Sequence, residues 1–118
     1  MDNLNRIIKF RAWEKENLSV NFEGAMHYDV VAQTYFGEWL FDNDYELMQY
    51  TGLKDKNGVE IYEGDIIKYH FRTINGNEEF ISEVFFEECM WLTKEHSLNR
   101  INEIEVIGNI YENKGVLK

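Results

Sequence analysis

Three histidines and one cysteine have the widest chemical repertoire in this sequence. His27, His70 and His96 lie far apart, and no C-x-x-C spacing accompanies Cys89, so the closely spaced ligand pairs of a zinc site are missing. Cys89 and His96 have the residue types of a nucleophile and its base, but no oxyanion-hole motif or third orienting group accompanies them. Because a lone cysteine commonly packs as a small apolar side chain, we expect neither a zinc site nor a cysteine nucleophile.

Closely spaced carboxylates raise the question of a calcium site. Asp42, Asp44 and Glu46 resemble the first half of an EF-hand loop. Counting from Asp42, Leu47 occupies the place of the loop's glycine and Leu53 the place of its bidentate glutamate. With both positions apolar, the sequence argues against calcium binding of this kind.

A second carboxylate pair has the residue types of an acid and a base. Glu63 and Asp65 flank Gly64, but carboxylates beside a turn glycine are commonly solvated, and nothing in the sequence indicates tuning for proton transfer. The phosphate-binding patterns G-x-x-x-x-G-K-[ST] and G-x-G-x-x-G are also absent. We therefore predict a protein that is not an enzyme and that needs no metal or cofactor.

Charge is unevenly distributed along the chain. The net charge is −10, from 22 acidic residues against 12 lysines and arginines. No lysine or arginine lies between Lys15 and Lys54, or between Arg72 and Lys94. Because nucleic acids are bound by clustered bases, this pattern disfavours them as partners. It suits a surface kept charged for solubility, or an acidic patch that meets a basic protein.

The bases that do cluster lie near the N-terminus. They are Arg6, Lys9, Arg11 and Lys15. Phe10 and Trp13 lie among them, a mixture that can stack on nucleobases and neutralise phosphates. Alternatively, Phe10 packs inward while Lys9 and Arg11 line a solvated strand face, and the acidity of the rest of the chain favours this interpretation. Direct nucleic-acid binding is therefore kept as the second hypothesis.

Tight turns divide the chain into short strands. Asn57-Gly58 and Asn75-Gly76 are dipeptides that suit the positive φ angles of hairpin turns, and Gly64-Asp65 and Gly108-Asn109 supply further bends. The runs between such signals are short and rich in β-branched and aromatic residues. The predicted strands cover residues 7–13, 28–35, 45–50, 66–71, 80–86 and 105–111. One short helix is predicted over residues 93–103, with Thr93 or Ser97 as its N-cap.

Short strands without long helices for parallel crossovers indicate an antiparallel, strongly bent sheet. A small partly open barrel and a compact β-sandwich both meet this description, and we favour the barrel. The 118 residues contain no proline and no flexible linker, so we expect residues 1–118 to form a single structural unit. The predicted fold class is mostly β with at most one short helix.

The same sequence predicts a reducing compartment. A single cysteine cannot form an internal disulfide, and the first residues lack the basic stretch and apolar run of a signal peptide. No apolar segment approaches the roughly 18 residues needed to cross a bilayer. We expect a cytoplasmic protein without a membrane partner.

Three segments of the chain share a pattern with a known family. They are residues 8–13 (IKFRAW), residues 47–58 with 60–67 (LMQYTGLKDKNG and EIYEGDII), and residues 105–113 (EVIGNIYEN). Together they resemble the YopX family of phage and prophage proteins, which carries no established activity. The resemblance implies an SH3-like barrel over residues 45–118, an N-terminal β extension over residues 1–44, and the cytoplasm of a bacterial host. Lys114 departs from the family pattern, where a proline often follows the closing Glu-Asn.

The function that fits these observations best is a non-catalytic accessory module that binds another macromolecule, most plausibly a host or phage protein. The predicted contact residues are three aromatic side chains and a polar loop: Tyr50, Tyr62, Trp91, Lys54, Asp55, Asn57 and Gly58. The alternative for the loop is structural, because Asp55, Asn57 and Gly58 are turn formers that set strand register. An enzyme of unknown type is the third hypothesis, and the sequence carries no signal for an oligomeric state.

Overall fold

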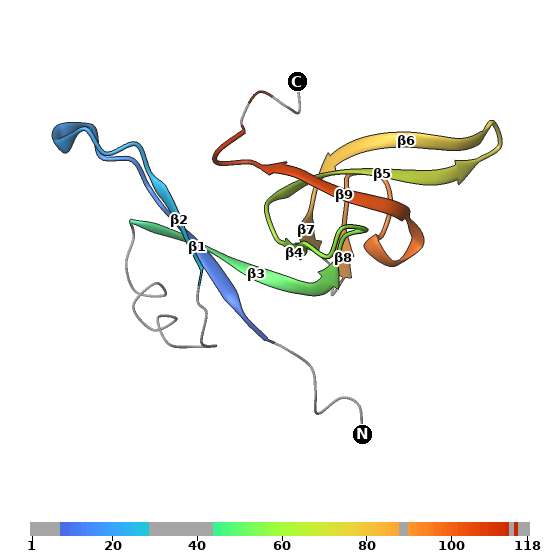
Figure 1. The fold of residues 1–118 in the computed structure, drawn as a ribbon, viewed down its shortest axis with the longest axis horizontal. Coiled ribbons are helices and arrows are strands. Elements are labelled where there is room, and N and C mark those ends of the chain that lie inside the picture. Colours follow the sequence, from blue (N-terminus) through green and yellow to red (C-terminus); the bar gives the residue numbers. More distant parts are fainter. Residues whose placement is uncertain (1–7, 29–43, 88–89, 114, 116–118) are drawn as a thin grey trace. The chain divides into compact units, whose positions relative to one another are not determined.

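The structure is a computed structural model that describes residues 8–28, 44–87, 90–113 and 115 (Figure 1). The fold is mostly antiparallel β, as predicted, and its described helical segments are two 3-10 turns of three residues each. The chain divides into two compact units, Met1–Gly52 and Leu53–Lys118, here called unit 1 and unit 2. Their boundary falls inside strand β3 (Tyr45–Lys54), whereas the sequence analysis placed it between residues 44 and 45.

Unit 1 is built around β1 (Phe10–Glu14), which lies between β2 (Ala25–Tyr28) and β3. Both pairings are antiparallel, and Trp13 lies opposite Met26 on one side and Glu46 on the other. The strand predicted over residues 7–13 overlaps β1, and the strand predicted over 45–50 is confirmed and extends to Lys54. The strand predicted over 28–35 lies outside the described residues except for Tyr28, the last residue of β2.

Local hydrogen bonds shape the connection between β1 and β2. The side chain of Asn17 accepts the N–H of Ser19 and caps the 3-10 turn η2 (Leu18–Val20). The backbone N–H groups of Asn17 and Phe22 donate to each other's carbonyls at 2.8 and 3.0 Å. Residues 15–21 are all exposed, so this arm is defined by backbone geometry rather than by buried side chains.

Unit 2 contains a curled three-stranded sheet in which β5 (Asp65–Thr73) lies between β6 (Gly76–Glu83) and β9 (Asn102–Asn109). The β5–β6 register is regular over all eight pairs, but the β5–β9 register shifts twice, between Ile66 and Ile67 and between Lys68 and His70. Such irregularities increase local twist, which agrees with the curling of the sheet in Figure 1. The strands predicted over residues 66–71 and 105–111 correspond to β5 and β9.

Three shorter strands complete unit 2. They are β4 (Glu60–Tyr62), beside β3 in the sheet order, and the two-stranded pair of β7 (Phe85–Glu87) and β8 (Met90–Leu92). The strand predicted over residues 80–86 is interrupted at Val84. Its N–H donates to the carbonyl of Asp65, and its carbonyl accepts the N–H of Gly64, so Val84 leaves the ladder between β6 and β7.

The predicted helix over residues 93–103 is wrong. The backbone and hydroxyl groups of Thr93 both bond to the backbone of His96, at distances from 2.8 to 3.0 Å, and an isolated bridge joins Leu92 to Ser97. These bonds close a tight loop that competes with helix formation, as threonine side chains often do. Ser97 does precede a 3-10 turn, η3 (Leu98–Arg100), but its side chain forms no cap hydrogen bond.

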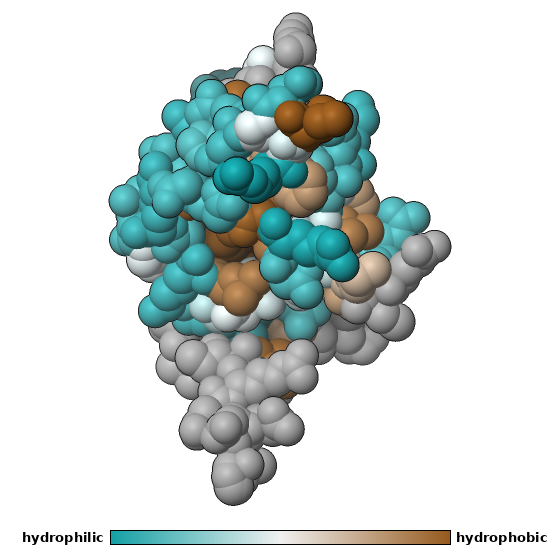
Figure 2. All heavy atoms as spheres, turned by 90° about the vertical axis from the view of Figure 1, so that its right-hand side faces the viewer, coloured by the Kyte–Doolittle hydropathy of each residue, from teal (hydrophilic) through white to brown (hydrophobic). Residues whose placement is uncertain are grey.

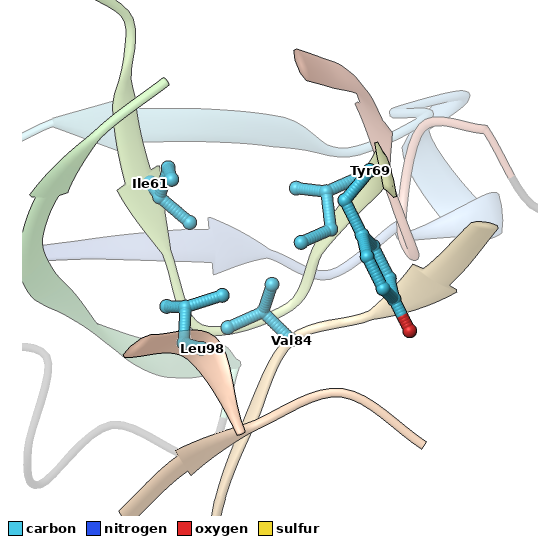
Figure 3. Packing of buried hydrophobic residues seen from close by; sticks show 5 residues of the cluster. Ile61, Tyr69, Val84 and Leu98 are labelled. Carbon is cyan, nitrogen blue, oxygen red and sulfur yellow. The ribbon is translucent and has the colours of Figure 1, made fainter. Parts of the chain in front are cut away.

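The core of unit 2 is a cluster of five buried side chains (Figure 3). They come from separate segments of the unit: Ile61, Ile67, Tyr69, Val84 and Leu98. In Figure 3 the hydroxyl of Tyr69 points away from Leu98 and Val84. Burial of one large apolar side chain contributes about 1.5–3 kcal/mol, so this cluster is the main apolar contribution to the stability of unit 2.

Candidate protein-binding surface

The predicted contact loop at residues 54–58 is organised by a carboxylate. One oxygen of Asp55, Oδ1, accepts the backbone N–H groups of Asn57 and Val59 at 2.8 and 2.9 Å, and Oδ2 accepts that of Val106 at 2.9 Å. Burial by itself would raise the pKa of Asp55, but these three N–H donors and the nearby charge of Lys56 hold the pKa below its ordinary value. Asp55 is only 7% exposed, so it anchors the loop to β9 rather than facing a partner.

The rest of the loop does face solvent. Lys54, Asn57 and Gly58 are exposed, and Gly58 adopts a φ angle of +84° that suits a tight turn. The backbone N–H of Lys56 donates to the carbonyl of Ile104 at 2.9 Å, which adds a second bond between the loop and β9. The loop is therefore a rigid, polar projection of unit 2.

The two predicted tyrosines are buried. Tyr50 is 5% exposed and Tyr62 is 3% exposed. The Lys9 ammonium lies 5.4 Å from the centre of the Tyr50 ring, and the backbone N–H of Tyr62 donates to Asp65 Oδ2 at 2.7 Å. Little of either ring reaches the surface, and Tyr50 belongs to unit 1 whereas the other predicted contact residues belong to unit 2.

Trp91 is the predicted residue with the geometry of a binding anchor. It lies in β8, packs partly against the core cluster and is only half-buried. Its ring meets that of Phe86, directly opposite in β7, edge to face with centroids 4.7 Å apart. A ring that is held by the core yet reaches the surface loses little conformational freedom on binding, which is typical of interface hot spots.

Two exposed apolar residues of the β7–β8 pair lie beside Trp91, and the sequence analysis did not single them out. Phe86 shares the face of Trp91, whereas Met90 directly precedes Trp91 in β8 and points to the opposite face of the pair. Phe86 is 52% exposed and Met90 is 48% exposed. We call Phe86, Met90 and Trp91 the hairpin patch. A signal was present in the sequence: Phe85 and Phe86 are adjacent, and adjacent strand residues point to opposite faces, so both rings could not enter one core.

The hairpin patch adjoins acidic residues. Glu87 follows Phe86 directly and is exposed. At the end of β6, burial and the charge of Glu63 raise the pKa of Glu83 above its ordinary value. Over residues 53–118 the sequence has thirteen acidic residues against eight lysines and arginines. Apolar atoms with acidic neighbours suit a partner surface that combines apolar and basic groups.

The side chains of Tyr69, Thr93, His96 and His27 have hydrogen-bond partners within their own units. Tyr69, inside the core cluster, has its hydroxyl 3.0 Å from Thr93 Oγ1 and 2.9 Å from His96 Nδ1, and burial raises its pKa. The His96 ring stacks on Phe71 at 3.9 Å, and His27 bonds to Glu14 at 2.8 Å in unit 1. No group of three histidine, cysteine or acidic residues suited to a metal ion occurs among the residues that the structure describes.

The basic residues of β1 and its surroundings are engaged within unit 1. Arg11 is 2% exposed, with its guanidinium 5.9 Å from the centre of the Tyr28 ring. Lys15 pairs with Glu46 at 3.1 Å. Arg6 lies outside the described residues. These contacts give the nucleic-acid hypothesis no support.

A cleft of about 490 Å³ lies in unit 1, beside the arm between β1 and β2. Its polar lining includes Glu14, Lys15, Glu16, Asn17 and Asp44. Its apolar lining comes from Val20 and Phe22.

Comparison with known proteins places the chain in a family. It is similar to a crystal structure of protein EF1440 from Enterococcus faecalis, with 28% sequence identity and a TM-score of 0.58, over 95% of this chain and 99% of that one. No curated protein matches the sequence. The family model described as YopX protein matches residues 9–118. Because that match covers almost the whole length, the chain belongs to the YopX family.

Proposed function

We propose that this protein is a non-catalytic, phage- or prophage-borne module that binds another protein in the cytoplasm of a host bacterium. The observation that carries the proposal is the hairpin patch, where two large apolar side chains are about half exposed next to a tryptophan seated on the core. An exposed aromatic ring that packs edge to face on a tryptophan held by the core is typical of a protein-binding hot spot.

The chemistry of the patch favours protein as the partner. Edge-to-face rings present both apolar faces and polarised edges, which suit protein side chains, while the acidic residues around them repel phosphate. Within the described parts of the chain, no helix has the length and apolar character needed to span a bilayer. Figure 2 shows apolar atoms reaching the surface at several places among polar ones on one side of the molecule.

The proposal is tested by co-purification from bacterial cytoplasm with three forms of the protein. Phe86→Lys places a charge in the patch without removing a buried group, because Phe86 is 52% exposed. Ile74→Lys makes the same kind of change at a residue that is 99% exposed in the β5–β6 turn, and it serves as the matched control. We expect one defined protein to accompany the wild type and Ile74→Lys, and to be lost with Phe86→Lys.

Binding is then measured with the purified partner. A Kd at least tenfold weaker for Phe86→Lys than for Ile74→Lys corresponds to about 1.4 kcal/mol at the patch. Circular dichroism and thermal unfolding establish that both variants are folded. Equal capture by all three forms would remove the patch as the binding surface.

A further inference from the structure

Strand β6 lies at the edge of its sheet. Its only neighbour in the three-stranded order is β5, as Figure 1 also shows for the described residues. The backbone N–H of Lys94 reaches β6 at the Ser82 hydroxyl, at 2.9 Å. The stretch from Gly76 to Ile81 therefore presents a row of backbone N–H and C=O groups on the side away from β5.

This edge lacks several of the features that commonly stop another strand from pairing. Bulges, prolines and lysines usually protect an edge. The β5–β6 register is regular from Ile66 opposite Glu83 to Thr73 opposite Gly76, so β6 carries no bulge. Its sequence, GNEEFISE, has no proline and no basic residue. The charged residues of β6 that could discourage another strand from pairing with it are all glutamates.

The side chains along the edge have a definite order of charge and hydrophobicity. Glu78 and Glu79 are neighbours on opposite faces of the strand, and Phe80 and Ile81 follow in the same alternation. Glu79 is exposed, Ile81 is 48% exposed, and Phe80 is half-buried against Tyr69 at a ring distance of 5.5 Å. Each face of the edge thus carries one carboxylate next to one apolar side chain. Within the sheet, Glu78 accepts the Thr73 hydroxyl at 2.8 Å, and Glu79 lies 3.8 Å from Lys68 Nζ and 3.9 Å from His70 Nε2.

We propose that the Gly76–Ile81 edge of β6 binds an extended segment of a partner protein as an added strand, and that this segment carries two adjacent basic residues beside two adjacent β-branched apolar residues. In strand addition, main-chain hydrogen bonds supply affinity and the alternating side chains supply specificity. Directly opposed residues share a face. The basic pair then meets Glu78 and Glu79, and the apolar pair meets Phe80 and Ile81. The inference rests on the proposed function, because it specifies how a protein partner is held.

The charges argue against a second copy of the chain as the occupant. The Gly76–Ile81 edge carries Glu78 and Glu79 and no base, so pairing this edge with itself would bring four carboxylates into one ladder. Like charges across paired strands destabilise the pairing, whereas a basic segment turns the same carboxylates into favourable partners.

The test uses the full-length chain labelled with ¹⁵N and capped six-residue peptides. Thr-Lys-Lys-Val-Val-Thr and the reversed order Thr-Val-Val-Lys-Lys-Thr cover the two strand directions, and Thr-Glu-Glu-Val-Val-Thr is the charge control. We expect one basic peptide to shift the β6 amide resonances and to slow hydrogen exchange at β6 amides that do not bond to β5. The glutamate peptide should leave β6 unchanged, and a version of the binding peptide with alternate N-methyl groups should bind at least about tenfold more weakly.

A matched pair of variants tests the charge. Glu79→Lys reverses one carboxylate of the edge and should weaken the basic peptide about tenfold. Glu23→Lys makes the same change in charge at an exposed position of unit 1 and should leave the affinity unchanged. Ile81→Thr keeps a β-branched side chain and should weaken binding about threefold, by removing apolar contact.

Three results would overturn the inference: no peptide shifts β6, the glutamate peptide binds as well as the basic one, or the β6 amides become protected as the concentration of the chain alone rises. The last result would mean that the strand added to β6 comes from a second copy of the chain.

Failure of the strand-addition inference can be distinguished from failure of the proposed function. If a partner is lost with Phe86→Lys and retained with Glu79→Lys, the hairpin patch stands and the β6 edge does not.

Discussion

Unit 2 buries the five side chains of its core cluster to 3% exposure or less, and these come from segments spread between residues 61 and 98. Among the described residues of unit 1, the side chains buried to a similar degree are Arg11, Ala12, Met48 and Tyr50, all on β1 and β3. The arm that continues from β1 is exposed along residues 15–21. Unit 2 is thus held by contacts between distant segments, whereas the arm of unit 1 is held by local backbone geometry.

Because of this difference, exposed apolar side chains are held rigidly in unit 2 and less rigidly on the arm of unit 1. Trp91 and Phe80 contact solvent at one side and the buried cluster of unit 2 at the other, so their positions are fixed before a partner arrives. Leu18 and Val20 on the arm of unit 1 are more exposed, at 78% and 69%, but they lie on a short turn with no buried residue. Preorganised apolar side chains give more affinity for the same area.

The largest effect is expected at the carboxylate that ties two distant segments of unit 2. Asp55→Ala removes the acceptor of three backbone N–H groups, from Asn57, Val59 and Val106. Partly buried donors left without a partner are costly, so the free energy of unfolding should fall by about 3 kcal/mol. Chemical denaturation of the purified protein measures this change.

The same loop supplies the control for Asp55. Asn57→Ala keeps the backbone N–H that donates to Asp55 and alters only an exposed side chain, so its effect should stay within about 0.5 kcal/mol. If the free energy of unfolding fell equally in Asp55→Ala and Asn57→Ala, the three hydrogen bonds to Asp55 would not be what stabilises the loop. The conclusion that contacts between distant segments hold unit 2 would then lose this support.

Backbone geometry should dominate in unit 1. Gly24 has a φ angle of +101°, and a Cβ atom there would lie 2.5 Å from Trp13 Cζ2. Gly24→Ala should therefore cost about 2 kcal/mol, observed as faster hydrogen exchange of the β1 and β2 amides. Gly76→Ala is the comparison, because Gly76 has a similar φ of +107° with nothing near the added atom, and about 1 kcal/mol is expected. If hydrogen exchange of the β1 and β2 amides were unchanged in Gly24→Ala, the claim that local backbone geometry holds the arm of unit 1 would be refuted.

One hydroxyl in each unit allows a matched deletion. Tyr69→Phe in unit 2 removes a buried hydroxyl between Thr93 and His96 and should reduce stability by about 1–1.5 kcal/mol. Tyr28→Phe in unit 1 removes a hydroxyl from a half-exposed residue, whose bond from Arg11 Nη1 is 3.5 Å long, and less than about 0.5 kcal/mol should be lost. Thermal unfolding compares the two, and a larger loss for Tyr28→Phe would reverse the comparison.

Particular residues of unit 2 show why some of its elements could be predicted from the sequence and others could not. Asn75-Gly76 predicted the β5–β6 turn because few residues accept the φ of +107° found at Gly76. Alternation predicted β5 because one of its faces is buried. The loop at Thr93 was predicted as helix because Thr93 and Ser97 are residue types of an N-cap. The Thr93 hydroxyl instead bonds to the backbone of His96, three residues further on, and helix propensity does not reveal this competing bond.

The candidate surface was less predictable than the fold. Tyr50 and Tyr62 have the residue type of interface anchors, and their burial depends on packing that spacing along the chain does not specify. Trp91 was identified by its residue type alone, and its packing against the core cluster could be seen only in the structure. Asp55 fitted both the recognition and the turn-forming interpretations, and its bond to Val106, fifty-one residues away, decided for the structural one.

The smallest effect is expected at Glu83, the last residue of β6. Burial and the charge of Glu63 raise the pKa of Glu83 in the folded protein, so the folded state holds this proton more tightly than the unfolded state does. Ionisation of Glu83 therefore opposes folding. This penalty is absent below the ordinary glutamate pKa of about 4.3 and complete once the pH exceeds the raised value.

Replacing this carboxylate by an uncharged amide removes the penalty. Glu83→Gln should stabilise the protein by about 0.5 kcal/mol near pH 7, and the gain should vanish near pH 4. Denaturation at a series of pH values measures this difference, with Glu23→Gln as the exposed control in unit 1. Glu63→Gln should give part of the same gain, because it removes the neighbouring charge but leaves Glu83 partly buried. A gain for Glu83→Gln that is constant from pH 4 to pH 7 would mean that packing rather than ionisation distinguishes this end of β6 from the solvated carboxylates of unit 1.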